Sequence, residues 1–243
     1  MKLYVYCLIA GIDALPHSLS GVAGAAVRLL KVGDFGVLVS EFGGERVPVN
    51  RQNVLAHAAV ARNLLDQTTP LPFRFGVLVT QEQLESFVTA RHDALKERLA
   101  IVRGCVEMSV KVISSANNDG KQQQLEPQAT GLEAKPGTAF LLEKRREILG
   151  TEARTAQAQQ LSSWLQTQLG DLLRDTRINT NLTDKLLLAT SHLVERGVVE
   201  NYRGRLKEAR LERPELNFLV SGPWPPYSFA NIDLEFKTQF GVS

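Results

Sequence analysis

Hydrophobic and polar positions change period several times over the first hundred residues, and each change predicts a new element. Residues Leu3 to Ile9 form an unbroken run of aromatic and aliphatic side chains, which is typical of a strand buried on both faces. Two further apolar runs, 25–31 and 35–41, are joined by a short stretch with a Gly-Asp pair, so they predict a β-hairpin. The chain is therefore expected to begin with three strands.

After Asn50 the pattern changes to the spacing of three and four residues that is typical of a helix. Asn50 is the expected N-cap, and Pro70 ends the segment. The predicted apolar face consists of Val54, His57, Ala58, Ala61, Leu64 and Leu65.

The next segments predict a short strand, a helical region and a longer strand. In "LPFRFGVLV" (71–79) Pro72 favours an edge strand or a bulge, because proline has no N–H for a sheet hydrogen bond. Residues 81–103 place apolar side chains on one side of a charged helix or pair of helices, which Gly104 ends. Residues 105–113 alternate as a strand.

A change of composition divides the chain in two. From 114 to 136 the residues are mostly Asn, Gln, Asp, Gly and Lys, which bury too little surface to order themselves. Beyond this stretch, a long apolar stripe predicts a helix over 137–173, followed by a strand, a helix and a closing strand that ends at Ser221. We expect an N-terminal α+β domain over 1–113, a flexible linker over 114–136, a C-terminal α+β domain over 137–222 and a proline-rich aromatic tail over 223–243.

The stretch "VSGPWPPYSFA" (220–230) combines three prolines with three aromatic rings. The prolines are Pro223, Pro225 and Pro226, and the rings are Trp224, Tyr227 and Phe229. Because proline fixes φ and removes an amide donor, the preceding strand is expected to stop at Ser221 and the backbone to become extended. The rings need an apolar surface. Two interpretations stay open: the tail packs back across the protein's own domains, or it binds the groove of a partner.

Composition and charge exclude several classes of function. The chain has 28 basic and 26 acidic residues, so its net charge of +2 gives no basic field for nucleic acid. We expect no membrane span and no secretory signal. The low cysteine content favours a cytoplasmic, reducing compartment. Cys7 and Cys105 lie in apolar runs without metal-binding spacing, so we expect buried free thiols.

A search for catalytic motifs finds none. The sequence has no phosphate-binding loop, no GxSxG and no HExxH. Its histidines, His17, His57, His92 and His192, are scattered, and the place of His57 on an apolar helix face favours a hydrogen-bonded core histidine. We therefore expect no enzymatic activity, no cofactor, no metal site and no small-molecule substrate.

Four segments resemble, in order, the gas vesicle protein F/L family. "TTPLPFRFGVLV" (68–79) is similar to its Leu-Pro-x-Arg-Phe-Gly segment, and "RGCVEMSVKV" (103–112) to its Gly-x-x-Glu-x-x-x-Lys strand. "KPGTAFLLEKRRE" (135–147) resembles the start of its long helix, with Phe140 in place of tyrosine, and "LVSGPWPPYSF" (219–229) resembles its C-terminal signature. The matched residues, expected to be structural or to form an interface, are Pro72, Arg74, Phe75, Gly76, Glu107, Lys111, Gly222, Pro223, Trp224, Pro225, Pro226, Tyr227 and Phe229.

The resemblance implies two α+β domains of ferredoxin-like or related type and no catalytic activity. It also implies a minor or accessory component that assembles the gas vesicle, an air-filled protein shell, by contacting the major shell protein and other accessory proteins. Such a protein would lie on the surface or in the wall of the vesicle and would bind neither nucleic acid nor membrane. The alternative is a ferredoxin-like module that binds or converts a small molecule.

Arg74 stands between two phenylalanines on a predicted strand and so points to the opposite face from both. We favour a structural ion pair with a carboxylate such as that of Glu107, over a contact with a partner protein.

Overall fold

The structure is a computed structural model that describes residues 1–12, 14–15, 18–114, 136–179, 182–183 and 185–232, and the side chains among these except those of 136–149. The helices are η1 (Val22–Gly24), α1 (Arg51–Arg62), α2 (Gln81–Ala90), α3 (His92–Val102), α4 (Pro136–Leu169), η2 (Gly170–Leu172), η3 (Arg196–Val198), α5 (Val199–Glu212) and α6 (Tyr227–Ala230). The strands are β1 (Lys2–Ala10), β2 (Leu19–Ser20), β3 (Ala26–Val32), β4 (Phe35–Phe42), β5 (Leu71–Pro72), β6 (Leu78–Val79), β7 (Cys105–Ser114), β8 (Leu173–Ile178), β9 (Leu186–Glu195) and β10 (Leu216–Trp224).

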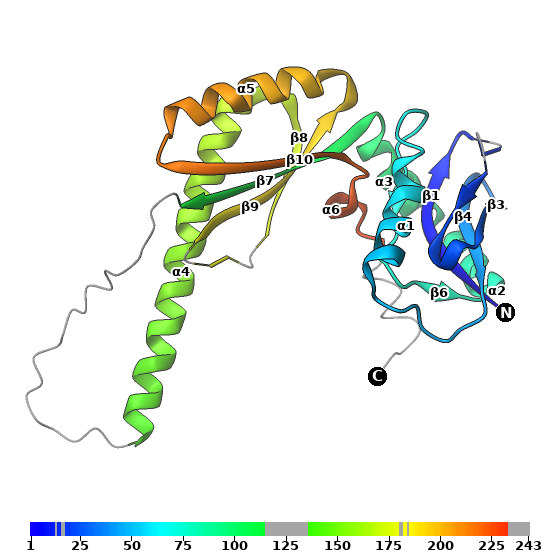
Figure 1. Cartoon of the computed structure of the whole chain (residues 1–243), viewed down its shortest axis with the longest axis horizontal. Coiled ribbons are helices and arrows are strands. Elements are labelled where there is room, and N and C mark those ends of the chain that lie inside the picture. The colour runs from blue at the N-terminus through cyan, green and yellow to red at the C-terminus, as the bar shows by residue number, and fades with distance from the viewer. Residues whose placement is uncertain (13, 16–17, 115–135, 180–181, 184, 233–243) are drawn as a thin grey trace, which may run out of the picture. The chain divides into compact units, whose positions relative to one another are not determined.

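The fold is α+β with antiparallel sheets, as the sequence predicts (Figure 1). One sheet has the strand order β2-β3-β4-β1-β5, with β6 also paired to β1. The other has the order β10-β7-β9-β8.

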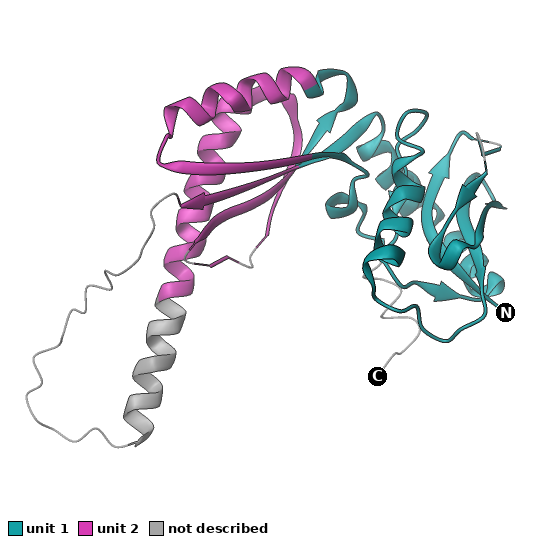
Figure 2. Cartoon of the chain, viewed as in Figure 1, with its two compact units in different colours: residues 1–108, 192–199, 222–243 teal, residues 109–191, 200–221 magenta. Residues whose placement is uncertain are grey.

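The chain forms two compact units that interleave along the sequence (Figure 2). Unit 1 consists of residues 1–108, 192–199 and 222–243, and unit 2 of residues 109–191 and 200–221. The strands β7, β9 and β10 each begin in one unit and end in the other. These boundaries differ from the consecutive domains expected from composition, and the expected linker lies, apart from its end residues, outside the described residues.

The first sheet of unit 1 is built around β1. Seven consecutive residues of this strand, from Leu3 to Ile9, are buried, which explains its unbroken apolar run. The predicted hairpin is confirmed: β3 and β4 pair through Val32 and Phe35 and are joined by two residues, of which Gly33 has a positive φ of 56°.

Helix α1 begins where the sequence indicates. The side chain of Asn50 accepts a hydrogen bond from the N–H of Asn53 at 2.8 Å, which confirms the N-cap. The predicted apolar face was partly wrong, because Val54 is 41% exposed whereas Val60 is buried. The helix also ends at Arg62, before the last two leucines of the predicted face.

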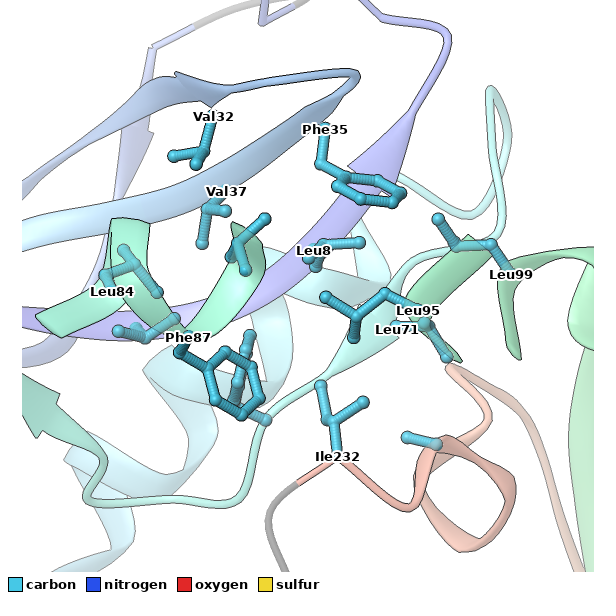
Figure 3. Close-up of a cluster of buried hydrophobic side chains, with 14 of the residues drawn as sticks. Leu8, Val32, Phe35, Val37, Leu71, Leu84, Phe87, Leu95, Leu99 and Ile232 are labelled. Carbon is cyan, nitrogen blue, oxygen red and sulfur yellow. The ribbon is translucent and has the colours of Figure 1, made fainter. Parts of the chain in front are cut away.

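The helical region after β6 is a pair of helices, α2 and α3, separated at Arg91. Thr80 and Gln83 form a capping box at the start of α2. With β1, β4 and β5, these helices enclose an apolar core to which the tail contributes as well. Figure 3 shows Leu8, Phe35, Leu71, Leu84, Phe87, Leu95, Leu99 and Ile232 converging in it.

Unit 2 covers its part of the second sheet with α4 and α5. The C-terminal half of α4 buries Ala158, Leu161, Leu165 and Leu169, and the ring of Trp164 lies 6.2 Å from that of Phe218 on β10. Arg205 of α5 donates a hydrogen bond to the carbonyl of Leu169 at 3.0 Å, which joins the two helices where α4 ends.

Two features of this sheet differ from the sequence expectations. The predicted long helix ends four residues early, and the charged segment "LRDTRI" that follows forms the edge strand β8. The prediction that β10 stops at Ser221 is wrong, since the strand continues to Trp224 through Pro223. Because β10 lies at the end of the strand order, the missing proline N–H does not interrupt a ladder.

Candidate functional site

The residues that carry the sequence motifs gather in unit 1, except for Lys111, which is exposed on the unit 2 part of β7. They form three groups: the segment from Pro72 to Gly76, the carboxylate of Glu107, and the stretch from Gly222 to Phe229. Each group contacts other elements of its own unit. We call these residues together the motif cluster.

The first group is tied to β1 and α1 by a chain of buried hydrogen bonds. The hydroxyl of Tyr4 lies 2.8 Å from Nδ1 of His57, and Nε2 of His57 lies 3.1 Å from the carbonyl oxygen of Phe73. The backbone N–H of Gly76, which has a φ of 91°, donates to the same tyrosine hydroxyl at 3.2 Å. One tyrosine and one histidine therefore hold both ends of the Arg-Phe-Gly turn.

The geometry fixes the protonation of His57. A carbonyl oxygen only accepts, so Nε2 carries the proton and Nδ1 accepts from Tyr4. Burial lowers the pKa of His57 to about 4, and burial raises the pKa of Tyr4, so both groups are neutral in the native network. This confirms the expectation of a hydrogen-bonded core histidine. The ring of Phe75, 5.8 Å from that of His57, closes the group on one side.

A pH titration of stability tests this network. An unfolded histidine gains a proton below its ordinary pKa of 6.5, whereas folded His57 does not until about pH 4, so stability falls as pH falls through this window. From pH 6.5 to 5 we expect His57 to cost about 2 kcal/mol, at about 1.4 kcal/mol per pH unit. Urea unfolding of wild type and His57→Gln at several pH values measures this.

Burial also lowers the pKa of His192 to about 4, so this histidine contributes to the pH dependence of stability in the same window. His57→Gln should therefore reduce this pH dependence without abolishing it. The control variant is His92→Gln at an exposed histidine. Hydrogen bonds to Asp93 and Asp34 raise the pKa of His92, so its removal should not reduce the loss of stability at low pH. An unchanged slope in His57→Gln would contradict the network.

The second group joins β7 to the tail. Glu107 is buried, and its carboxylate accepts hydrogen bonds from the backbone N–H of Ser228 at 2.8 Å and from the Ser228 hydroxyl at 2.6 Å. The sequence suggested Arg74 as the partner of Glu107. In the structure the partner of Glu107 is Ser228. Arg74 lies exposed in the connection after β5, whereas the carboxylate faces the first turn of α6.

The third group packs closely on β7 and in the core. Gly222 has a φ of 125°, and a Cβ atom there would lie 2.8 Å from both the carbonyl oxygen of Glu107 and Sδ of Met108. Only glycine satisfies both conditions. Further on, Pro225 and Pro226 are buried, and Phe229 is 2% exposed within the core.

Trp224, like Tyr227, is a ring of the tail that keeps partial contact with solvent. It is half-buried, and the guanidinium of Arg62 on α1 lies 5.2 Å above its ring, a cation–π contact. Beside it, Pro223, the end of α1 and the residues that follow this helix line a cavity of about 390 Å³.

The arrangement of the motif cluster is suited to holding the fold, because the Gly76 N–H and the Glu107 carboxylate are both hydrogen-bonded within unit 1. Across the described residues, no group of three or more histidine, cysteine or acidic side chains is placed to hold a metal ion. Cys7 and Cys105 are buried and form no disulfide, and burial raises the pKa of Cys7, which keeps Cys7 an unreactive thiol.

Sequence reasoning missed Tyr4 and Ser228, which complete the cluster. A tyrosine inside a fully apolar strand was the available signal for Tyr4, because a buried hydroxyl needs a hydrogen-bond partner. Nothing in the pattern marked Ser228.

No helix in the described part of the chain has the length and apolar character to cross a bilayer.

A family model described as gas vesicle synthesis protein GvpL/GvpF matches residues 2–231. Gas vesicle protein F1 of Halobacterium salinarum is 23% identical and covers 99% of this chain and 98% of its own length. Gas vesicle protein L2 of the same organism is 26% identical, with coverage of 93% and 90%. The crystal structure of gas vesicle protein GvpF from Microcystis aeruginosa shares the fold, with a TM-score of 0.74 at 19% identity over 95% of this chain and 99% of that one.

Proposed function

Since this chain belongs to the gas vesicle synthesis protein GvpL/GvpF family, we propose that it is an accessory or minor structural protein for assembly of the gas vesicle shell. It acts by binding the major shell protein and other gas vesicle accessory proteins, and it performs no reaction. The observation that carries this proposal is the family match over nearly the whole chain.

The structure supports binding through a surface other than the tail. Phe229, Ala230 and Ile232 are each 2% exposed in the core, so the tail is occupied within its own unit. If the tail instead bound the groove of a partner, these side chains would have to leave the core. The free energy of their burial would be lost, which disfavours this alternative.

We place the partner contact on β10 of unit 2. This strand is at the end of the described strand order, and an edge strand offers unpaired N–H and C=O groups to another chain. Leu219 and Val220 on it are 56% and 37% exposed. Since Phe218 is buried, alternation places Leu219 on the opposite face of the sheet. Gas vesicle shell subunits must present a strongly apolar face before assembly, and a strand edge with exposed aliphatic side chains suits such a face.

Capture of the major shell protein tests this proposal. The tagged chain is co-expressed with that protein, purified, and the co-purified shell protein is quantified. Leu219→Glu adds a charge on the exposed face of β10 and is expected to reduce capture roughly tenfold or more, as for the loss of an interface anchor.

Leu211→Glu is the matched control, because Leu211 is 78% exposed on α5 of the same unit, so the charge change is equal and the position is not on β10 itself. Both variants should give the circular dichroism spectrum of the wild type. Equal capture by both would remove β10 from the interface, and no capture by the wild type would overturn the function itself. Truncation before Pro223 is a poor substitute test, since it removes core residues.

A further inference from the structure

A second polar feature of unit 1 lies apart from the motif cluster and serves no role described so far. A cavity of about 480 Å³ is lined by the end of β1 and the turn after it, the segment after α1, the end of α3 and the residue that opens η3. Its lining residues include Ile12, Thr68, Thr69, Leu99, Arg103 and Arg196. This volume is within the range of pockets that hold small molecules.

The charged side chains among the described lining residues of this cavity are both positive. Arg103 and Arg196 both line it, and the described residues of its lining include no carboxylate. In the described residues neither guanidinium forms an ion pair. Two like charges beside one cavity raise each other's energy, and an anion between them would relieve this repulsion.

Arg196 is held in place for such a contact. It is half-buried, and its Nη2 donates to the carbonyl of Thr68 at 3.2 Å and approaches Oγ1 of Thr69 at 3.5 Å. Its backbone N–H donates to the carbonyl of Gly104 at 2.8 Å. Its Nε–H is buried and has no hydrogen-bond partner in the described part of the chain. Leaving a donor of a charged group unsatisfied is costly, and an oxyanion is the partner that guanidinium geometry matches best.

We propose that this cavity binds a small organic anion. Arg196 and Arg103 hold its carboxylate or phosphate group. Leu99 and Ile12 contact its apolar body, since they supply the apolar part of the wall. The site is a ligand site without a reaction, and it does not depend on the proposed role in shell assembly.

The test uses phenyl phosphate and benzoate as probes, measured by isothermal titration calorimetry with the full chain. Inorganic phosphate and benzyl alcohol serve as comparisons, the first without an apolar body and the second without a charge. We expect at least one of the two organic anions to bind about tenfold or more tightly than either comparison compound. The buried Nε–H of Arg196 provides a second readout, because its NMR resonance should shift on binding.

The variants Arg103→Gln and Arg196→Gln are each expected to weaken binding about tenfold or more. Arg46→Gln, at an exposed arginine outside the cavity, removes the same charge and should bind as the wild type does. Arg196→Gln also removes the bonds to Thr68, so if it does not fold, the exposed Arg103 decides the test alone.

The proposal is overturned if neither organic anion binds the wild type, or if the folded arginine variants bind as tightly as the wild type. Inorganic phosphate that binds as tightly as phenyl phosphate would overturn the assignment of an apolar body.

Discussion

Replacing Phe229 by alanine is expected to lower the free energy of unfolding of unit 1 by about 3–5 kcal/mol, the range for removing a buried phenylalanine. The ring is 2% exposed and packs in the core that β1, β4, β5, α2 and α3 also line. Its loss leaves a cavity that a closely packed core cannot fill, because the neighbouring strands are fixed by their pairing. An effect of this size is a large part of the stability of an ordinary domain.

Fluorescence can assign this effect to unit 1. The chain has two tryptophans, of which Trp224 lies in unit 1 and Trp164 in unit 2. In a Trp164→Phe background, urea unfolding followed by tryptophan emission reports on unit 1 through Trp224. Leu211→Ala is the control, since this side chain is 78% exposed and its truncation should leave the midpoint almost unchanged. A midpoint for Phe229→Ala equal to that of the control would show that the tail is not part of the core.

Gly222→Ala is expected to have the second large effect, about 2–6 kcal/mol. A residue with a side chain at φ 125° is strained by about 1–3 kcal/mol. The added Cβ would also lie 2.8 Å from the Glu107 carbonyl oxygen, and overpacking of this kind costs about 1–3 kcal/mol more. The backbone of β7 cannot move away without disturbing its own pairing, so the two costs add.

The same fluorescence assay measures this change, with Gly43→Ala as the matched substitution. A Cβ at Gly43 meets no atom within 4 Å, and its φ is outside the left-handed region, so its replacement should be close to neutral. If both variants unfold at the same urea concentration, the close contact between Gly222 and β7 is not present in solution.

Local patterns predicted the elements of this fold well. The Gly-Asp turn, the cap at Asn50 and the helical region that ends before Gly104 depend on residues that are neighbours in sequence, and the structure confirms each. The strand β8 escaped prediction, because an edge strand with Arg, Asp and Thr has no apolar period to read. The face of α1 was partly misassigned, since which side is buried depends on what the helix packs against.

The motif cluster shows where sequence reasoning ends. The segments were found from their resemblance to a family, and His57 was correctly expected to be a core residue. The hydrogen-bond partner of Glu107 could not be predicted in this way. Ser228 is 121 positions from Glu107, and no spacing rule connects the two residues. The sequence suggested Arg74, which is nearer along the chain, but its place outside the core excludes it as the partner of a buried carboxylate.

The interleaving of the two units has a consequence for synthesis on the ribosome. Residues 1–108 supply most of unit 1, yet Phe229 and Ile232 must also be present before its core is filled. The core of the nascent N-terminal sheet therefore stays incomplete, with an apolar surface exposed, while more than a hundred further residues are translated. During that interval the unfinished sheet is a substrate for chaperones, and slow translation of the intervening segment would lengthen its exposure to aggregation.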